Sequence, residues 1–379
     1  MLVVGAGPAG SSAAAALAAA GRSVILLDAA RHPRPKACAE YASPRIADEL
    51  RRLNLPDDAW RPDAHPTRGM RVIRGHDAVD LTYADAKGRR TAWGLDRERF
   101  DAALAAFAAG QGVRVMERTP FRDGRREGDT WEITTRGITI RSRWLIGADG
   151  ARSRVAHRLG VERRIRWPRR LGLVAHYESV AGLDDHGEMH VGRGHYVGLA
   201  PLAGGRLNVG MALPMDGGRS AEARFAAAIG ALPAVADRLA GRRRLTPIRG
   251  ASPIGHRVAR AAGPGWMLIG DSAGFVDPFT GEGIFRALRS ARAAADALAK
   301  GDAGAESRYL DERRAAFAAK DALTWTIQAM LAAPPVMSYA LRHLADRPEL
   351  ARRLGSALGD LRPAADALSP AFLVQVLRP

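Results

Sequence analysis

The feature that most constrains the fold is a glycine-rich turn at the start of the chain. Gly5, Gly7 and Gly10 follow a short apolar run and precede an alanine-rich segment. In this spacing the first glycine permits a tight turn, the second lets the backbone approach a pyrophosphate, and the third allows a helix to pack closely on a strand. The N-terminus of such a helix also attracts anions. The pattern predicts a strand, a phosphate-binding turn and a helix.

An acidic residue about 20 positions after such a turn binds a ribose hydroxyl. Asp28 stands at that distance, at the end of a second predicted strand over residues 23–27. Its carboxylate would repel the 2′-phosphate of NADP. The sequence therefore predicts a dinucleotide site, whose members are Gly5, Gly7, Ala9, Gly10 and Asp28.

The rest of the chain predicts an α/β protein of several packed domains. Its 379 residues are 47% hydrophobic, which is enough for a large core and a buried cofactor. Alternating apolar and polar runs predict strands, and a long helix is expected over residues 283–299. We expect a Rossmann-like dinucleotide-binding domain from residues 1–69, 94–160 and 256–300, an inserted β-rich substrate domain from 70–93 and 161–255, and a helical C-terminal portion from 301–379.

The formal charge of +17 is carried almost entirely by arginine, since the chain has only four lysines. Such a charge predicts an anionic or carrier-bound substrate or a membrane surface as partner. Nucleic acid is not expected, because no basic motif is interleaved with aromatic residues. The arginine runs at 163–166 and 242–244 are interpreted as solvent-exposed faces.

The only cysteine, Cys38, excludes an intramolecular disulfide, which is typical of a reducing compartment. The first residues lack the positive start of a signal peptide, and no apolar stretch reaches the ~20 residues of a membrane span. We expect a cytoplasmic protein with at most peripheral membrane contact.

A histidine-rich segment offers a candidate metal site. Its members are His186, His190, His195, Asp184, Asp185 and Glu188. The surrounding alternation predicts a strand and turn, in which histidines four residues apart do not share a face. We interpret the segment as a solvated hairpin without a metal.

Four segments carry a resemblance to a known family. They are the turn at 5–10 with Asp28; Arg34-Pro35-Lys36-Ala37-Cys38-Ala39-Glu40, followed by Asp96-Arg97-x-x-Phe100-Asp101; Gly147-Ala148-Asp149-Gly150; and Gly270-Asp271-Ser272-Ala273-Gly274, continuing to Pro278-x-x-Gly281-Glu282-Gly283-Ile284. In this order they resemble FAD-dependent reductases and hydroxylases related to geranylgeranyl reductase, within the aromatic-hydroxylase-like flavoproteins.

The resemblance implies that FAD is bound by a further set of residues, namely Cys38, Ala39, Arg97, Asp149, Asp271, Pro278, Gly281, Gly283 and Ile284. It also makes Cys38 the candidate catalytic residue, and Ala39 departs from the family's usual glycine. Physical chemistry supports the last segment independently. An acid at a strand end can accept from a ribitol hydroxyl, and a helix N-terminus favours negative charge on reduced flavin.

Two reactions remain open. In the first, reduced flavin passes a hydride to the C=C bond of a hydrophobic isoprenoid- or polyketide-like metabolite, with Glu40 or Tyr41 as a candidate proton donor. In the second, a C4a-hydroperoxyflavin hydroxylates the substrate. The segment 196–201 lacks the aromatic-rich pattern of geranylgeranyl reductases, which keeps the monooxygenase alternative open.

A remote third alternative is an α/β-hydrolase, because Gly270-Asp271-Ser272-Ala273-Gly274 also fits a nucleophile elbow. No second dinucleotide fingerprint is present in the sequence. NADH or NADPH is therefore expected to bind transiently as electron donor, or a separate flavin reductase supplies the electrons.

Overall fold

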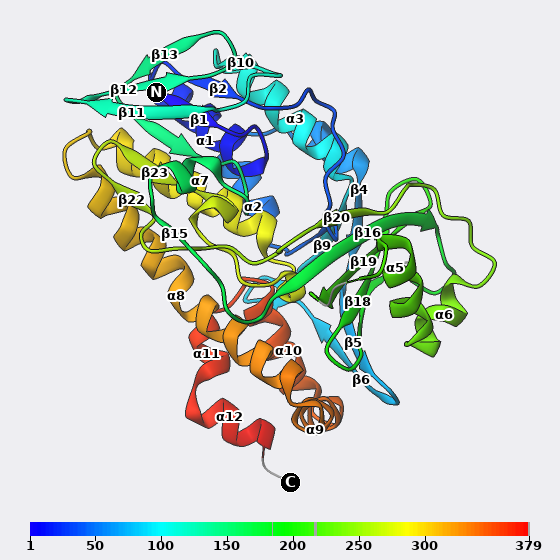
Figure 1. Cartoon of the computed structure of the whole chain (residues 1–379). Helices are drawn as coiled ribbons and strands as arrows, with labels where there is room; N and C mark the ends of the chain where they lie inside the picture. The colour runs from blue at the N-terminus through cyan, green and yellow to red at the C-terminus, as the bar shows by residue number, and fades with distance from the viewer. Residues whose placement is uncertain (184, 216–217, 378–379) are drawn as a thin grey trace.

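The computed structural model describes residues 1–183, 185–215 and 218–377. Its N-terminal strand lies inside a six-stranded sheet (Figure 1). The strands are, in spatial order, β10 (Arg114–Met116), β2 (Ile25–Leu27), β1 (Leu2–Val4), β14 (Leu145–Gly147), β23 (Trp266–Leu268) and β22 (Ala262–Gly263). All neighbours pair in parallel except β22 with β23. The parallel strands bring segments more than 100 residues apart to one edge.

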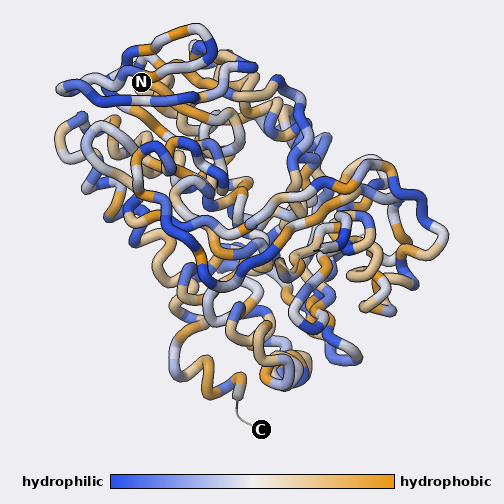
Figure 2. The backbone as a smooth tube through the Cα atoms, viewed as in Figure 1, coloured by the Kyte–Doolittle hydropathy of each residue, from blue (hydrophilic) through white to orange (hydrophobic). Residues whose placement is uncertain are grey.

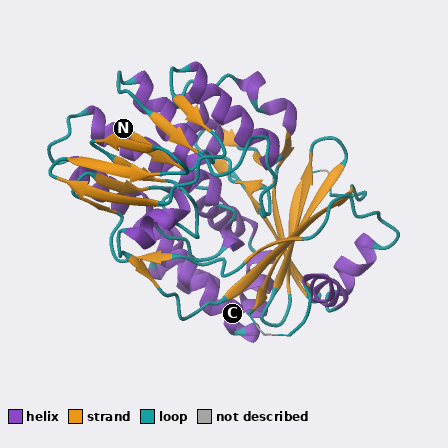
Figure 3. Ribbon diagram, turned by 45° about the horizontal axis from the view of Figure 1, so that its top comes forward, coloured by secondary structure: helices purple, strands orange, loops and turns teal. Residues whose placement is uncertain are grey.

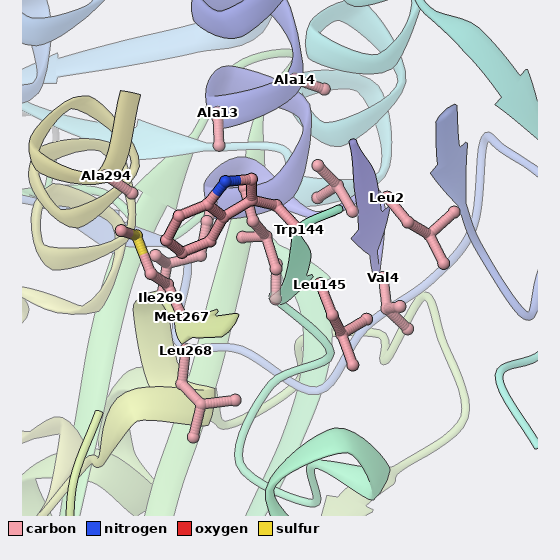
Figure 4. Close-up of a cluster of buried hydrophobic side chains, with 14 of the residues drawn as sticks. Leu2, Val4, Ala13, Ala14, Trp144, Leu145, Met267, Leu268, Ile269 and Ala294 are labelled. Atoms are coloured by element: carbon pink, nitrogen blue, oxygen red, sulfur yellow. The ribbon is translucent and has the colours of Figure 1, made fainter. Parts of the chain in front are cut away.

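Three helices pack around this sheet: α1 (Pro8–Ala19), α3 (Arg97–Gly110) and α7 (Gly283–Ala299). Helix α1 contacts both of the others. Its close approach to β1 requires glycine, because a Cβ at Gly10 would lie 1.8 Å from the carbonyl oxygen of Gly5. Figure 4 shows the buried core between sheet and helices, where Trp144 and Met267 lie beside Ala13 and Ala294.

A second, seven-stranded sheet lies beside the first domain (Figure 3). Its strands are, in order, β20 (Arg249–Ala251), β16 (Arg170–Glu178), β19 (Arg206–Pro214), β18 (Tyr196–Leu202), β17 (His186–Val191), β5 (Gly69–Arg74) and β6 (Asp77–Thr82). Only β17 and β5 pair in parallel. Helices α5 (Ala221–Gly230) and α6 (Pro233–Leu239) pack on it through Phe225 and Val235.

The C-terminal part of the chain is helical. It comprises α8 (Ala305–Ala332), α9 (Pro334–Ala345), α10 (Pro348–Leu358), α11 (Ala364–Leu368) and α12 (Pro370–Leu377). Helix α8 belongs to two hydrophobic cores: Tyr309 packs in the core of the first sheet, and Leu323 and Ile327 pack in a core shared with β5 and β6. Figure 2 shows that hydrophobic and hydrophilic residues alternate along these helices. Within the described ranges, no helix is both long enough and apolar enough to cross a bilayer.

Smaller elements complete the fold. They are a three-stranded sheet of β3 (Tyr41–Ala42), β9 (Ala92–Leu95) and β4 (Ala64–Thr67); a meander of β11 (Asp123–Glu127), β12 (Thr130–Thr134) and β13 (Thr139–Ser142); the strand pairs β7 (Ala84–Asp85) with β8 (Gly88–Arg89) and β15 (Glu162–Arg163) with β21 (Arg257–Val258); the helices α2 (Ile46–Arg52) and α4 (Arg154–Arg158); and the 3-10 turns η1 (Asp57–Ala59), η2 (Arg61–Asp63), η3 (Gly270–Ala273) and η4 (Pro278–Thr280).

The predicted α/β class, Rossmann-like domain and helical C-terminal portion are confirmed, and the helix predicted over 283–299 is α7. One expectation was wrong in part. The histidine segment forms the predicted hairpin, in which β17 pairs with β18, but the hairpin is not solvated throughout. His190 and Glu188 are buried and hydrogen-bonded to each other at 2.7 Å. Glu188 also pairs with Arg238 at 2.5 Å, which gives this carboxylate partners inside the protein. Asp184 lies outside the described residues.

Candidate functional site

A cavity of about 670 Å³ lies between the first domain and the seven-stranded sheet. One side is formed by the glycine-rich turns of the first domain. The other side is formed by β5, β6 and β16–β19. Most of the predicted cofactor residues line this cavity: Gly7, Ala9, Cys38, Ala39, Arg97, Asp149, Asp271, Pro278, Gly281, Gly283 and Ile284. Among them, Gly7, Asp149 and Asp271 come shortly after the parallel strands β1, β14 and β23, whose carboxyl ends meet at one edge of the sheet.

The N-terminus of α1 opens into this cavity. Its N-cap, Gly7, provides no side-chain cap for the first-turn amides, and Gly7, Pro8 and Ala9 all face the cavity. The space at Gly7 is open, because a Cβ there would have Arg34 as its nearest contact at 4.0 Å. Uncapped amides and open space at a helix N-terminus fit a pyrophosphate group.

Three predicted residues lie beside this turn rather than on the cavity. Gly5 has a φ of 102° and Gly10 packs on it, so both shape the turn. The Asp28 carboxylate accepts hydrogen bonds from the Ala6 amide at 2.8 Å and from Arg34 at 3.2 Å. In this structure Asp28 fixes the turn, and its contact with a ribose stays a prediction.

A second uncapped helix N-terminus reaches the same cavity. After β23 the chain passes through η3 and η4 to Gly281, whose φ of 66° favours glycine. Helix α7 then begins at Gly283 without a side-chain cap. Gly281 packs against Tyr41, since a Cβ there would lie 2.8 Å from the ring. Two helix N-termini thus point at one cavity, an arrangement that fits the pyrophosphate and the ring system of a flavin dinucleotide.

Asp149 and Ser272 hold these turns together. Asp149 accepts from Ser153 at 2.6 Å and from the Val155 amide at 3.2 Å, while burial raises the pKa of its carboxyl. The Ser272 hydroxyl is fully buried and donates to the carbonyl oxygens of Gly147 and Ile269. Ser272 is therefore no nucleophile, and the hydrolase alternative is wrong.

Cys38 lies on the loop between β2 and β3, at the edge where the two sides of the cavity meet. Its Sγ accepts from Arg97 Nη1 and from the Glu40 amide, both at 3.3 Å. Arg97 is buried and also forms a bidentate pair with Asp101 at 2.8 and 2.9 Å. Arg97 therefore anchors the cysteine loop to α3.

Ala39 fits the neighbouring strand. A Cβ at Gly210 of β19 would lie 3.1 Å from the Ala39 methyl group. The methyl group that replaces the family's glycine thus fills space left by Gly210.

Glu40 is a buried residue that the sequence singled out only as a candidate proton donor. Its carboxylate accepts from Asn208 at 2.8 Å and from the Arg97 amide at 3.0 Å, and it contacts His176 Nε2 at 2.6 Å. These partners come from β16, β19 and α3. Glu40 also lines the cavity, and its three partners hold the loop against the sheet.

Two tyrosines, Tyr41 and Tyr83, line the cavity and contact each other. The hydroxyls of Tyr41 and Tyr83 are 2.8 Å apart, and both residues are buried. Burial raises the pKa of Tyr41 well above its ordinary value and that of Tyr83 to about 12. Both hydroxyls therefore remain protonated at neutral pH. The sequence could not reveal this pair, because Tyr83 lies in an irregular segment 42 residues away.

A third buried cluster also escaped sequence reasoning. Tyr196 donates to Asp277 at 2.5 Å, and Arg170 lies 3.5 Å from the same carboxylate. Burial raises the pKa of Asp277, and the Arg170 guanidinium opposes this shift. The cluster joins β16 and β18 to the flavin-side turn that begins at Pro278.

Comparisons with known proteins agree with this geometry. The model of the FAD-binding domain family matches residues 1–323. The chain is 32% identical over 333 residues to a menaquinone reductase of Mycolicibacterium smegmatis, covering 79% of this chain and 76% of that protein. It is 31% identical over 331 residues to a digeranylgeranylglycerophospholipid reductase of Methanothrix thermoacetophila, covering 83% and 82%.

Solved structures share the fold. A flavoprotein/dehydrogenase from Cytophaga hutchinsonii superimposes with a TM-score of 0.85 at 21% identity, over 99% of this chain and 96% of that chain. A flavin-dependent brominase superimposes with a TM-score of 0.81 at 19% identity, over 96% of each chain.

The family match and the two uncapped helix N-termini establish FAD as the cofactor. The chain belongs to the FAD-binding domain family and is an FAD-dependent oxidoreductase of its geranylgeranyl reductase-like branch.

Proposed function

We propose that this protein reduces C=C bonds of a hydrophobic isoprenoid- or polyketide-like metabolite. The observation that carries the proposal is the composition of the cavity. Its flavin side is formed by glycine-rich turns, whereas its sheet side is lined by apolar side chains, including Met70, Val72, Leu81, Met189, Leu199, Met211 and Ile254.

An apolar wall next to a flavin suits a hydrocarbon chain. Burial of each CH₂ group contributes about 0.8 kcal/mol, so several groups in this cavity supply useful affinity. The names of the two sequence relatives also favour reduction, since both are reductases and one name contains a geranylgeranyl group.

The reduction adds a hydride and a proton across the double bond. FAD, when bound and reduced, supplies the hydride with its electron pair. We propose that Tyr41 donates the proton, because its hydroxyl stays protonated and Tyr83 lies within hydrogen-bond distance to support it. Cys38 is proposed to contact the substrate at the flavin edge of the cavity. The electrons come from NADH or NADPH bound transiently, or from a separate flavin reductase.

The test uses the purified FAD-bound protein, reduced chemically under argon and mixed with a geranylgeranyl lipid. We expect flavin reoxidation without oxygen and a product heavier by one H₂ per reduced bond, measured by absorbance and mass spectrometry. The outcome that overturns the proposal is a substrate that stays unreduced under argon but gains an atom of isotopically labelled oxygen in air. That result would establish the monooxygenase alternative.

A further inference from the structure

We propose that one face of the protein docks on a bilayer that contains anionic phospholipids. This face, called here the Arg–Trp face, consists of Arg163, Arg164, Arg166, Trp167, Arg169, Arg257 and Trp325. The proposed function supplies the reason for docking, because a lipophilic substrate resides in a membrane. Its physical basis is independent of catalysis.

The five arginines are exposed and line a surface cleft of about 700 Å³. Within the described parts of the chain, Arg163 alone of the five makes side-chain hydrogen bonds, and these go to the backbone carbonyls of Gly160 and Glu162. Among the residues that the structure describes, none of the five pairs with a carboxylate, whereas exposed arginines elsewhere do, as in the pair of Arg71 with Asp80. Five like charges in one cleft repel each other, and they are stabilised when an anionic surface approaches.

The nearest acidic side chain along the strand does not neutralise this cleft. Glu162 lies 3.2 Å from His157 Nδ1 and 3.9 Å from His256 Nδ1. Its carboxylate therefore lies close to two histidines. The arginines remain available to phosphate groups, which they bind through bidentate hydrogen bonds.

Two tryptophans stand beside the arginines. Trp167, within the arginine-rich loop, is 48% exposed, and Trp325 of α8 is 37% exposed. Their rings stack with centroids 6.1 Å apart. Large aromatic surfaces are rarely left in water, and tryptophan is enriched at the membrane–water interface, where its apolar ring and polar N–H are both accommodated.

The helix that carries Trp325 continues the face as an apolar stripe. Residues 322–341, from the end of α8 into α9, contain no charged side chain. Ala322, Trp325, Ala329 and Ala332 are exposed at helical spacing, and Val336 follows with 46% exposure. Figure 1 shows this end of α8 beside the segment that joins β15 to β16, and Figure 2 shows that segment as hydrophilic. Cationic and apolar groups therefore lie together on one surface.

The Arg–Trp face also adjoins a wall of the cavity. Arg169 immediately precedes β16, in which Gly172 lines the cavity, and Ile254 of the opposite segment lines it as well. The Ile254 amide donates to the Arg170 carbonyl at 3.0 Å, which holds the two segments together.

An acidic carrier protein would also match the arginines, but it would leave the uncharged end of α8 without a function. The bilayer accounts for both.

Vesicle sedimentation of the FAD-bound protein tests the proposal. The wild type should bind vesicles of phosphatidylcholine with phosphatidylglycerol, and salt should weaken binding. The variant Arg164→Glu/Arg166→Glu should bind at least about tenfold more weakly. The control Arg136→Glu/Arg242→Glu makes the same charge change at exposed sites in the β12–β13 turn and in the loop before β20, and it should bind like the wild type.

A second measurement follows the tryptophans. Brominated phospholipids should quench wild-type fluorescence more than that of Trp167→Phe/Trp325→Phe. Equal loss of binding in both charge variants, or no quenching difference, overturns the proposal. So does binding to an acidic acyl carrier protein without vesicle binding. Alkene reduction with a short substrate dispersed in detergent should be unchanged in the docking variants, so failure of the reaction and failure of docking are distinguishable.

Discussion

At the scale of single residues, the assignment of Tyr41 makes a direct prediction. The variant Tyr41→Phe should reduce C=C turnover by about 10²–10⁴-fold, because a positioned proton donor contributes that much to rate. FAD binding should not change, since the ring remains packed against Gly281. The measurement is turnover under argon together with the flavin spectrum.

The matched control for this variant is Tyr196→Phe. Tyr196 also lines the cavity, but its hydroxyl is held by Asp277 at 2.5 Å. It should keep most of the turnover. A comparable loss in both variants would remove the special role of Tyr41.

Gly7 offers a second residue-scale prediction. Its φ of −79° suits alanine, and a Cβ there meets nothing closer than 4.0 Å. The variant Gly7→Ala should therefore fold normally, while the added methyl group blocks the approach of a pyrophosphate. We expect at least about a tenfold loss of FAD affinity, or about 1.4 kcal/mol, by fluorescence titration. Gly110→Ala, near the end of α3 with open space around it, should leave the affinity unchanged.

At the scale of elements, Glu188 connects β17 to α6. Burial opposes ionisation, but His190 and Arg238 together lower the pKa of this carboxyl below its ordinary value of 4.5. The stability that ionised Glu188 contributes is therefore present above pH 4.5, and it is lost as the pH falls through the lowered value.

We expect Glu188→Gln to lower the free energy of unfolding at neutral pH by about 1–3 kcal/mol, because Arg238 and His190 lose a charged partner. The difference in the free energy of unfolding between this variant and the wild type should become smaller at acidic pH. Urea unfolding at neutral and at acidic pH measures this difference. Glu98→Gln, at an exposed position of α3, serves as the control. A gap that is the same at both pH values would contradict the assigned charge interaction.

Elements also show where sequence reasoning succeeds and where it stops. The turn at Gly5–Gly10 and helix α7 could be predicted, because spacing within a few residues determines them. The pairing of β5 with β17 could not, since Gly69 lies opposite His186 across 117 residues. The Tyr41–Tyr83 pair and the stacking of Trp167 on Trp325 depend on such long-range placement as well. The arginine run at 163–166 and the uncharged stretch of α8 can each be read from the sequence, but their position side by side cannot.

At the scale of the whole molecule, the cavity that would hold FAD is lined by residues of two hydrophobic cores, and α8 contributes to both cores. Removal of FAD should therefore destabilise both cores together, in one cooperative thermal transition. A ligand at 100 times its Kd stabilises by about 2.7 kcal/mol, and the midpoint should fall accordingly in the apoprotein. Calorimetry with and without FAD measures the shift. Two separate transitions, of which only one responds to FAD, would show that the cores unfold independently.

The parallel pairing of β5 with β17 has a consequence for folding during translation. The hairpin of β5 and β6 leaves the ribosome long before its partner strand is synthesised. At ordinary rates of translation the delay is on the order of ten seconds. A two-stranded hairpin is only marginally stable alone and exposes a free edge. We therefore expect the yield of folded enzyme in a cell to depend on how quickly residues 83–191 are synthesised after the hairpin. It should also depend on whether another molecule covers the free edge of β5 until β17 pairs with it.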